Sequence, residues 1–128
     1  NTGMAVVGNT GSSKRIKFGP IGNTVNLASR VQGATKYLKC STLITDETKS
    51  RMGQNLRARR ICTARVNNIA ATVDLFELQG TSKPIEASLE KRYADALAFF
   101  EEQKFNDAVR ELGSLLQARP QDGPAKLL

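Results

Sequence analysis

The sequence contains no histidine and no tryptophan, and its only cysteines are Cys40 and Cys62. The absence of histidine removes the commonest acid–base side chain and the commonest metal ligand. The two cysteines lack the spacing of a disulfide scaffold or a zinc site, which favours a reducing compartment. No apolar run approaches the ~20 residues that span a membrane, and no signal peptide is visible. These absences predict a cytoplasmic chain without membrane contact of its own. Since the chain starts at Asn1 without a Met, we interpret it as a fragment of a larger protein, which could carry a membrane anchor.

Acidic residues are scarce in the first part of the chain. Residues 1–80 contain twelve Lys and Arg but four Asp and Glu, a net charge of +8. Residues 81–128 contain seven basic and eight acidic residues, a net charge of −1. An excess of positive charge of this size favours an acidic binding partner. A nucleoside triphosphate, a nucleic acid and an acidic protein surface are the three alternatives, beside a simple contribution to solubility.

The most informative stretch is Gly22–Arg30, which follows a short strand-like run. Asn23 is a favourable N-cap, because its amide oxygen can accept from the free N–H groups of a first helical turn. Apolar residues recur at helical spacing and predict a helix over residues 23–33, namely Val25, Ala28, Val31 and Ala34. Asn26 and Arg30 stand four residues apart on another face. An amide and a guanidinium near a helix start suit an anionic ligand, since Arg holds phosphate with two parallel hydrogen bonds. By itself such a pair more often decorates a solvated helix face.

Residues 18–30, Phe-Gly-Pro-Ile-Gly-Asn-Thr-Val-Asn-Leu-Ala-Ser-Arg, resemble the signature of the class III nucleotidyl cyclases, the adenylate and guanylate cyclases. Residues 1–12 resemble the strand and glycine-rich turn before that signature, and residues 41–48 resemble the strand and helix start after it. The resemblance covers about residues 1–79 and implies an α+β fold, the C-terminal half of a ferredoxin-like cyclase sheet whose first half is missing. It also implies a lyase of intracellular signalling that converts ATP to cyclic AMP and pyrophosphate.

The resemblance assigns roles to individual residues of this sequence. Asn26 would orient the ribose, and Arg30 would stabilise the transition state as the 3′-hydroxyl attacks the α-phosphate. Gly19 falls at the purine-selecting position but has no side chain that could read a base, so GTP stays open as an alternative substrate. Asn23 is a further substrate-binding candidate. Arg65 is the nearest substitute for a triphosphate-binding lysine that this chain lacks.

Several parts of the family's site are not visible in this chain. The turn that carries the triphosphate-binding lysines corresponds to residues 67–72, Asn-Asn-Ile-Ala-Ala-Thr. The resemblance implies Mg²⁺ or Mn²⁺, held by two aspartates expected upstream of Asn1, so no metal ligand is assigned here. Active sites of the family form between two catalytic domains, which implies a second cyclase domain as partner, most simply in a homodimer. The 128-residue chain alone is therefore expected to be inactive.

Periodicity predicts sheet strands and helices up to residue 79, with the helices on one face of the sheet. The expected strands are 4–7, 15–18, 40–45, 56–66 and 72–78, the expected helices 23–33 and 46–52, and the expected turn 8–13. Residues 80–85 have the composition of a linker. Residues 86–128 are expected to form a helical hairpin that resembles one degenerate tetratricopeptide repeat, with Phe99 and Leu112 mutually buried. A plain helical hairpin explains the pattern equally well.

Two further functions stay open at this point. A non-catalytic cyclase-homology module, used for nucleotide binding or dimerisation, is favoured by Gly19 and by the missing lysines. A nucleic-acid binder would use basic residues of the middle region, namely Arg57, Arg59, Arg60 and Arg65. Because stacking aromatic residues and a recognisable motif are absent, no nucleic-acid partner is expected.

Overall fold

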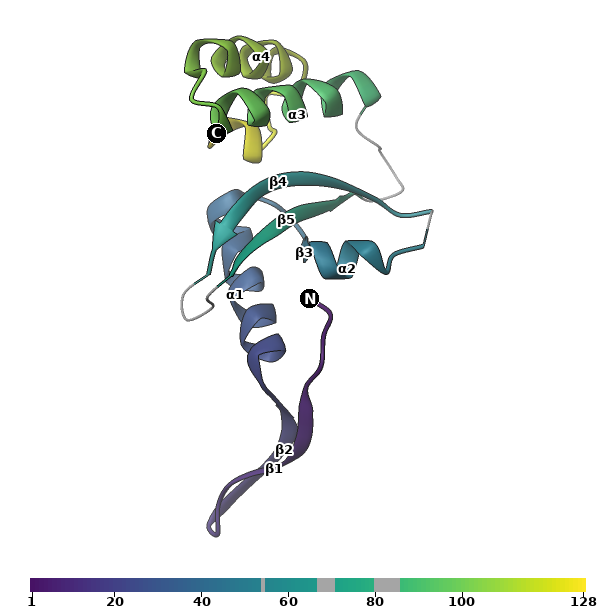
Figure 1. Ribbon diagram of the computed structural model, residues 1–128, viewed down its shortest axis with the longest axis vertical. Coiled ribbons are helices and arrows are strands. Elements are labelled where there is room, and N and C mark those ends of the chain that lie inside the picture. The colour runs from purple at the N-terminus through teal and green to yellow at the C-terminus, as the bar shows by residue number, and fades with distance from the viewer. Residues whose placement is uncertain (54, 67–70, 80–85) are drawn as a thin grey trace.

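The computed structural model describes residues 1–53, 55–66, 71–79 and 86–128 (Figure 1). Its elements in chain order are β1 (Val6–Ser12), β2 (Arg15–Ile21), α1 (Asn23–Leu38), β3 (Leu43–Thr45), α2 (Asp46–Ser50), β4 (Arg57–Arg65), β5 (Thr72–Gln79), α3 (Ala87–Glu101), α4 (Phe105–Ala118) and a 3₁₀ turn, η1 (Pro124–Lys126). Strands and helices are mixed, as expected for an α+β chain. The predicted linker over 80–85 lies outside the described residues.

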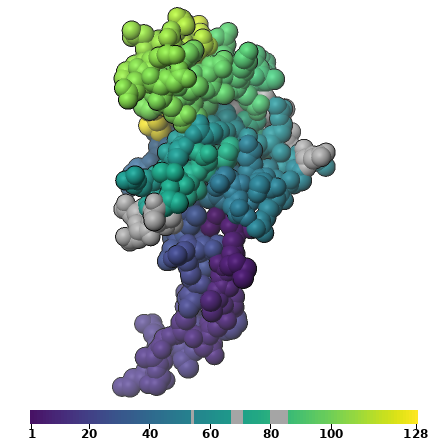
Figure 2. Space-filling view, viewed as in Figure 1, coloured from purple at the N-terminus to yellow at the C-terminus, as the bar shows by residue number. Residues whose placement is uncertain are grey.

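Strands β1 and β2 form a two-stranded antiparallel sheet that projects from the rest of the molecule (Figures 1 and 2). We call residues 6–21 the arm. The predicted turn over 8–13 is wrong, because β1 continues to Ser12 and only Ser13 and Lys14 turn. Every residue of β1, including its glycines, has a partner in β2, and Gly8 lies opposite Gly19. Pairing between the strands outweighs the local turn preference of this composition.

Strands β3, β5 and β4 form a second antiparallel sheet, in that order, with β5 in the centre. The pairing of β4 with β5 is irregular between Arg60 and Cys62. The sheet, α1 and the C-terminal helices share one hydrophobic core, to which each contributes buried side chains, among them Val31, Leu43, Ile61, Leu75, Tyr93, Leu97 and Leu115. The sheet and the C-terminal helices are thus joined by packing as well as by the chain.

The helices do not lie on one face of this sheet, as the sequence had suggested. Leu75 of β5 faces α1, since it lines a pocket together with Val31. The next residue, Phe76, lies under the ammonium group of Lys49 in α2, 4.1 Å from the ring centre. Because neighbouring side chains of a strand point to opposite faces, α1 and α2 flank the sheet from opposite sides. Helix α3 lies along the edge strand β4, where the Tyr93 hydroxyl donates to the Ile61 carbonyl at 3.2 Å.

Helices α3 and α4 form the expected hairpin (Figure 1). Leu112 is buried in it, but Phe99 is only half-buried, so the predicted mutual burial of these two side chains is wrong. The buried residues of α3 are Tyr93, Ala96 and Leu97. Leu97 therefore occupies the buried position that was expected for Phe99.

Three arginines of β4 bind carboxylates of the C-terminal segment, and we call this set of contacts the β4 anchor. The ion pairs are Arg57–Glu90 at 3.0 Å, Arg59–Asp122 at 2.9 Å and Arg60–Glu101 at 2.8 Å. Part of the positive charge of residues 1–80 is therefore neutralised by acidic residues of the same chain. Three of the four arginines considered for nucleic-acid binding are engaged in this way.

Arg59 is the buried centre of the β4 anchor. Its side chain is 5% exposed and that of Asp122 is 2% exposed, and two hydrogen bonds of 2.9 and 3.2 Å join them. Glu77 accepts a third hydrogen bond at 2.7 Å, and the ring of Tyr93 lies 4.5 Å from the guanidinium carbon. Burial alone would lower the pKa of Arg59, but Asp122 and Glu77 outweigh it and raise the pKa. Asp122 also accepts from the Ala125 amide at 3.1 Å, which fixes the chain after α4.

Candidate functional site

Helix α1, which carries most of the signature, begins after a glycine. Gly22 is the N-cap, with a φ of 136° that side chains rarely adopt, and its carbonyl accepts from the amides of Val25 and Asn26 at 3.1 Å. The expected capping by Asn23 is wrong, because Asn23 is already helical and the cap makes no side-chain hydrogen bond. The helix continues to Leu38, beyond the predicted end at Gly33, since Ala34 and Leu38 pack on the core.

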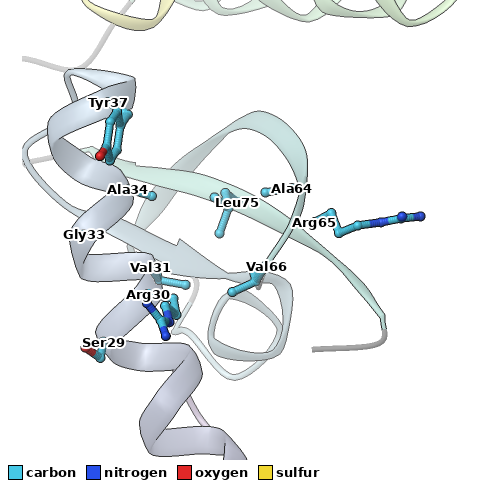
Figure 3. Close-up of a pocket in the computed structure, with 10 residues that line it drawn as sticks. All are labelled: Ser29, Arg30, Val31, Gly33, Ala34, Tyr37, Ala64, Arg65, Val66 and Leu75. Carbon is cyan, nitrogen blue, oxygen red and sulfur yellow. The ribbon is translucent and has the colours of Figure 1, made fainter. Parts of the chain in front are cut away.

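A pocket of about 430 Å³ lies between α1 and the end of β4 (Figure 3). We call it the Arg30 pocket. Its polar lining residues are Ser29, Arg30, Tyr37 and Arg65, and the others are Val31, Gly33, Ala34, Ala64, Val66 and Leu75. It therefore combines the guanidinium of Arg30 with apolar surface, and none of its lining residues is acidic.

The two guanidinium groups of this pocket differ from those of the β4 anchor. Arg30 and Arg65 are both exposed, and in the part of the chain that the structure describes neither forms an ion pair. Arg30 lies against α1 beside Val31, whereas Arg65 extends outward from β4 (Figure 3). The exposed guanidinium of Arg30, which has no carboxylate partner among the described residues, can bind an anion, and its planar shape suits phosphate oxygens.

The structure brings only two of the five predicted site residues into this pocket. Asn26 is exposed one helical turn before Arg30, about 6 Å along the axis, but does not line the pocket. Asn23 lines a different hollow, of about 300 Å³, together with residues near the N-terminus and the start of α2. Gly19 lies in β2, within the arm. Arg30 and Arg65, which are distant in sequence, both line the pocket because α1 lies near the end of β4, but the Arg65 side chain extends away from α1 (Figure 3).

Sequence reasoning missed Tyr37 as a pocket residue. Its ring is 80% exposed and lines the Arg30 pocket from the last turns of α1. The signal was present, since Tyr37 lies seven residues after Arg30 and therefore on the same helical face. It was overlooked because the helix was expected to end at Gly33.

Among the described residues, no group of three or more Cys, Asp or Glu side chains is placed to hold a metal ion. The lining of the Arg30 pocket offers no carboxylate, so these residues do not fit Mg²⁺, which prefers oxygen ligands that carry charge. As for membranes, none of the helices described here combines the length and the apolar character of a membrane span.

Two curated proteins are similar to parts of this chain. "Adenylate cyclase 1" of Rhizobium meliloti (strain 1021) is 28% identical over 88 residues, which are 69% of this chain and 13% of that protein. "Adenylate cyclase" of Anabaena cylindrica is 46% identical over 44 residues, which are 34% of this chain and 9% of that protein. The chain thus spans a small part of the length of these relatives. No family model and no solved structure matches it. The chain contains a region related to adenylate cyclases.

Proposed function

We propose that this chain is part of an adenylate cyclase that converts ATP to cyclic AMP and pyrophosphate, and that the Arg30 pocket holds phosphate groups of the substrate. One observation carries the proposal. Within the described residues, Arg30 is a cation without an ion pair that lines a pocket free of acidic residues, in a chain that is similar in part to adenylate cyclases. GTP is the alternative substrate.

The chemistry explains why a guanidinium is useful at this place. When the ribose 3′ oxygen attacks the α-phosphorus, negative charge increases on the phosphoryl oxygens and on the leaving pyrophosphate. A fixed donor that faces those oxygens stabilises the transition state more than the ground state. Arg30 lies on a regular helix and is suited to this task. Asn26, one turn earlier on α1, would hold the ribose so that its 3′ oxygen is aligned with the phosphorus.

A divalent cation, Mg²⁺ or Mn²⁺, would activate the attacking hydroxyl and neutralise phosphate charge. Because the Arg30 pocket has no carboxylate among its lining residues, these residues do not supply its ligands. A second candidate function, a cyclase-homology module that binds nucleotide without converting it, is favoured by Gly19 and by the lack of lysine in residues 67–72. In that case Arg30 would contribute to nucleotide affinity but to no turnover.

The partner that we propose is a second cyclase domain, most simply a second copy of this chain. Opposed residues of an antiparallel pair share one face, so the register of the arm separates its side chains. One face carries Val7, Ile16, Phe18 and Pro20, all exposed, with no charged residue. The other face carries Arg15 and Lys17, together with the exposed residues Val6 and Ile21 nearer the rest of the molecule. A lone two-stranded hairpin is at best marginally stable in water, and exposed apolar patches mark interaction sites. A second copy would cover the apolar face and leave the basic face in solvent.

The proposed function is tested by replacing Arg30 in a form of the protein that makes cyclic AMP. Arg30→Ala is expected to lower kcat by ~10²–10³-fold with little change in KM, as for the loss of a transition-state donor. Arg30→Lys should rescue poorly, because an ammonium cannot form the forked contact. Arg51→Ala is the matched control, since Arg51 is an exposed arginine at the C-cap of α2, outside the pocket. A folded Arg30→Ala protein that cyclises ATP at the parental rate would contradict the assignment.

A further inference from the structure

We propose that the ring of Tyr37 stacks on the purine base of a nucleotide whose phosphates lie at Arg30, which makes the Arg30 pocket a two-part nucleotide site. The inference rests on the proposed function and adds a base-binding residue to it. Tyr37 and Arg30 line the same pocket, and both project from α1 (Figure 3).

The spacing along α1 suits the length of a nucleotide. Arg30 and Tyr37 are seven residues apart, which places them on one helical face about 10 Å apart along the axis. A nucleotide laid along this face, with its α-phosphate near the guanidinium, extends its base toward the ring. The phosphate and base subsites then lie about two turns apart on the same helix.

The surface between these two residues is open. A Cβ atom added at Gly33 would meet no heavy atom within 4 Å, other than its neighbours and its own helix backbone. Ala34, the next residue on this face, has only a methyl group and also lines the pocket. Small residues at both positions leave room for a ribose along the helix, between the cation and the aromatic ring.

The exposure of Tyr37 distinguishes it from a structural aromatic residue. Its ring is 80% exposed, whereas Tyr93, the only other tyrosine, is 1% exposed and bonded to the Ile61 carbonyl. Gly19 lies in the arm and has no side chain, so it supplies no contact to a base. Stacking on an aromatic ring tolerates every base, because each base has a π face. The site should therefore bind ATP and GTP with similar affinity.

The chain provides its own optical probe for this contact. It has two tyrosines and no tryptophan, so its fluorescence comes from Tyr37 and the buried Tyr93. Titration of the 128-residue chain with ATP should quench the Tyr37 emission, after correction for nucleotide absorption. Tyr37→Phe leaves only Tyr93 emission and should show no quenching, although it should bind ATP with the parental affinity. Parental binding without quenching would place the base away from the ring and overturn the inference.

Calorimetric affinities for ATP, GTP and inorganic tripolyphosphate separate the two subsites. Tyr37→Ala should weaken ATP and GTP about 5–150-fold, as expected for the loss of one stacked base, and leave tripolyphosphate unchanged. Arg30→Ala should weaken all three. Gln32→Ala, an exposed residue of α1 outside the pocket, is the control and should change none.

The outcomes distinguish this inference from the proposed function. Unchanged ATP affinity in Tyr37→Ala, with tripolyphosphate binding that still depends on Arg30, overturns the stacking and leaves the proposed function standing. Equal losses of ATP and tripolyphosphate in Tyr37→Ala show a structural role and also overturn it. If the parental chain binds none of the three ligands, both proposals fail.

Discussion

Removal of the Asp122 carboxylate would test the β4 anchor, because it leaves a buried arginine with one partner fewer. Arg59 donates two hydrogen bonds to Asp122, and both side chains are at most 5% exposed. In Asp122→Ala the guanidinium stays buried, and the Ala125 amide loses its acceptor as well. Asp122→Asn keeps an oxygen at the same place and removes only the charge. The two variants therefore separate charge from hydrogen bonding.

The expected cost follows from the geometry. Breaking a buried ion pair by removing one partner destabilises a protein by about 3–5 kcal/mol. Glu77 remains 2.7 Å from Arg59 but is 17% exposed, so it compensates in part and places Asp122→Ala near the lower limit, at about 3 kcal/mol. Glu90→Ala breaks the Arg57 ion pair at the exposed end of the anchor and should cost about 1 kcal/mol or less.

Urea unfolding followed by far-ultraviolet circular dichroism measures these differences as shifts of the midpoint at constant slope. Replacing both partners by apolar residues, Arg59→Met with Asp122→Leu, should restore most of the stability, because no charge is then left buried. An Asp122→Ala protein within 1 kcal/mol of the parent would refute the reasoning. So would a double variant that is no more stable than Asp122→Ala.

Two other predictions concern the arm and the helical hairpin. Phe18→Ser on the apolar face of the arm, where the ring is 70% exposed, should reduce self-association in light scattering without lowering the melting temperature. Lys17→Ser on the basic face is the control. A parental chain that stays monomeric at high concentration would contradict the proposed interface. In the hairpin, Leu115→Ala should cost ~2–5 kcal/mol because Leu115 is fully buried, while Phe99→Ala at a half-buried ring should cost less than the ~3–5 kcal/mol of a buried one. Equal losses from these two hairpin variants in urea unfolding would mean that the burial described here is wrong.

Local signals predicted the elements whose residues follow one period. Strands β4 and β5 fall within a residue of their expected bounds, and the two C-terminal helices were found from their apolar spacing. The predicted start of α2 at Asp46 is confirmed. Thr45 is its N-cap, because its hydroxyl oxygen accepts from the Thr48 amide. These features depend on residues that are close in sequence, so they can be predicted from the sequence alone.

The remaining features depend on contacts between distant segments. Gly8 and Gly11 belong to a strand only because β2 lies opposite them, and Gly33 lies within a helix only because α1 packs on the core beyond it. Likewise, the charge of Arg59 gave no sign of burial, since its partner Asp122 follows 63 residues later. For the site, the signature indicated Arg30, and Arg65 was a guess from its position. Their shared pocket with Tyr37 required the structure.

The β4 anchor has a consequence for any shortened form of this protein. Without residues 86–128, Arg57 would lose its carboxylate partner, and the strand itself would be uncovered at the sheet edge. Among the described carboxylates, Arg59 would keep only Glu77 and Arg60 only Asp74. Such a fragment would behave as a polycation, and it would adhere to heparin or nucleic acid with the steep salt dependence of counterion release. Its bare edge would also recruit other strands. Apparent nucleic-acid affinity and aggregation of a truncated chain would thus result from the truncation. In the full chain, carboxylates of the C-terminal segment neutralise positive charge on β4.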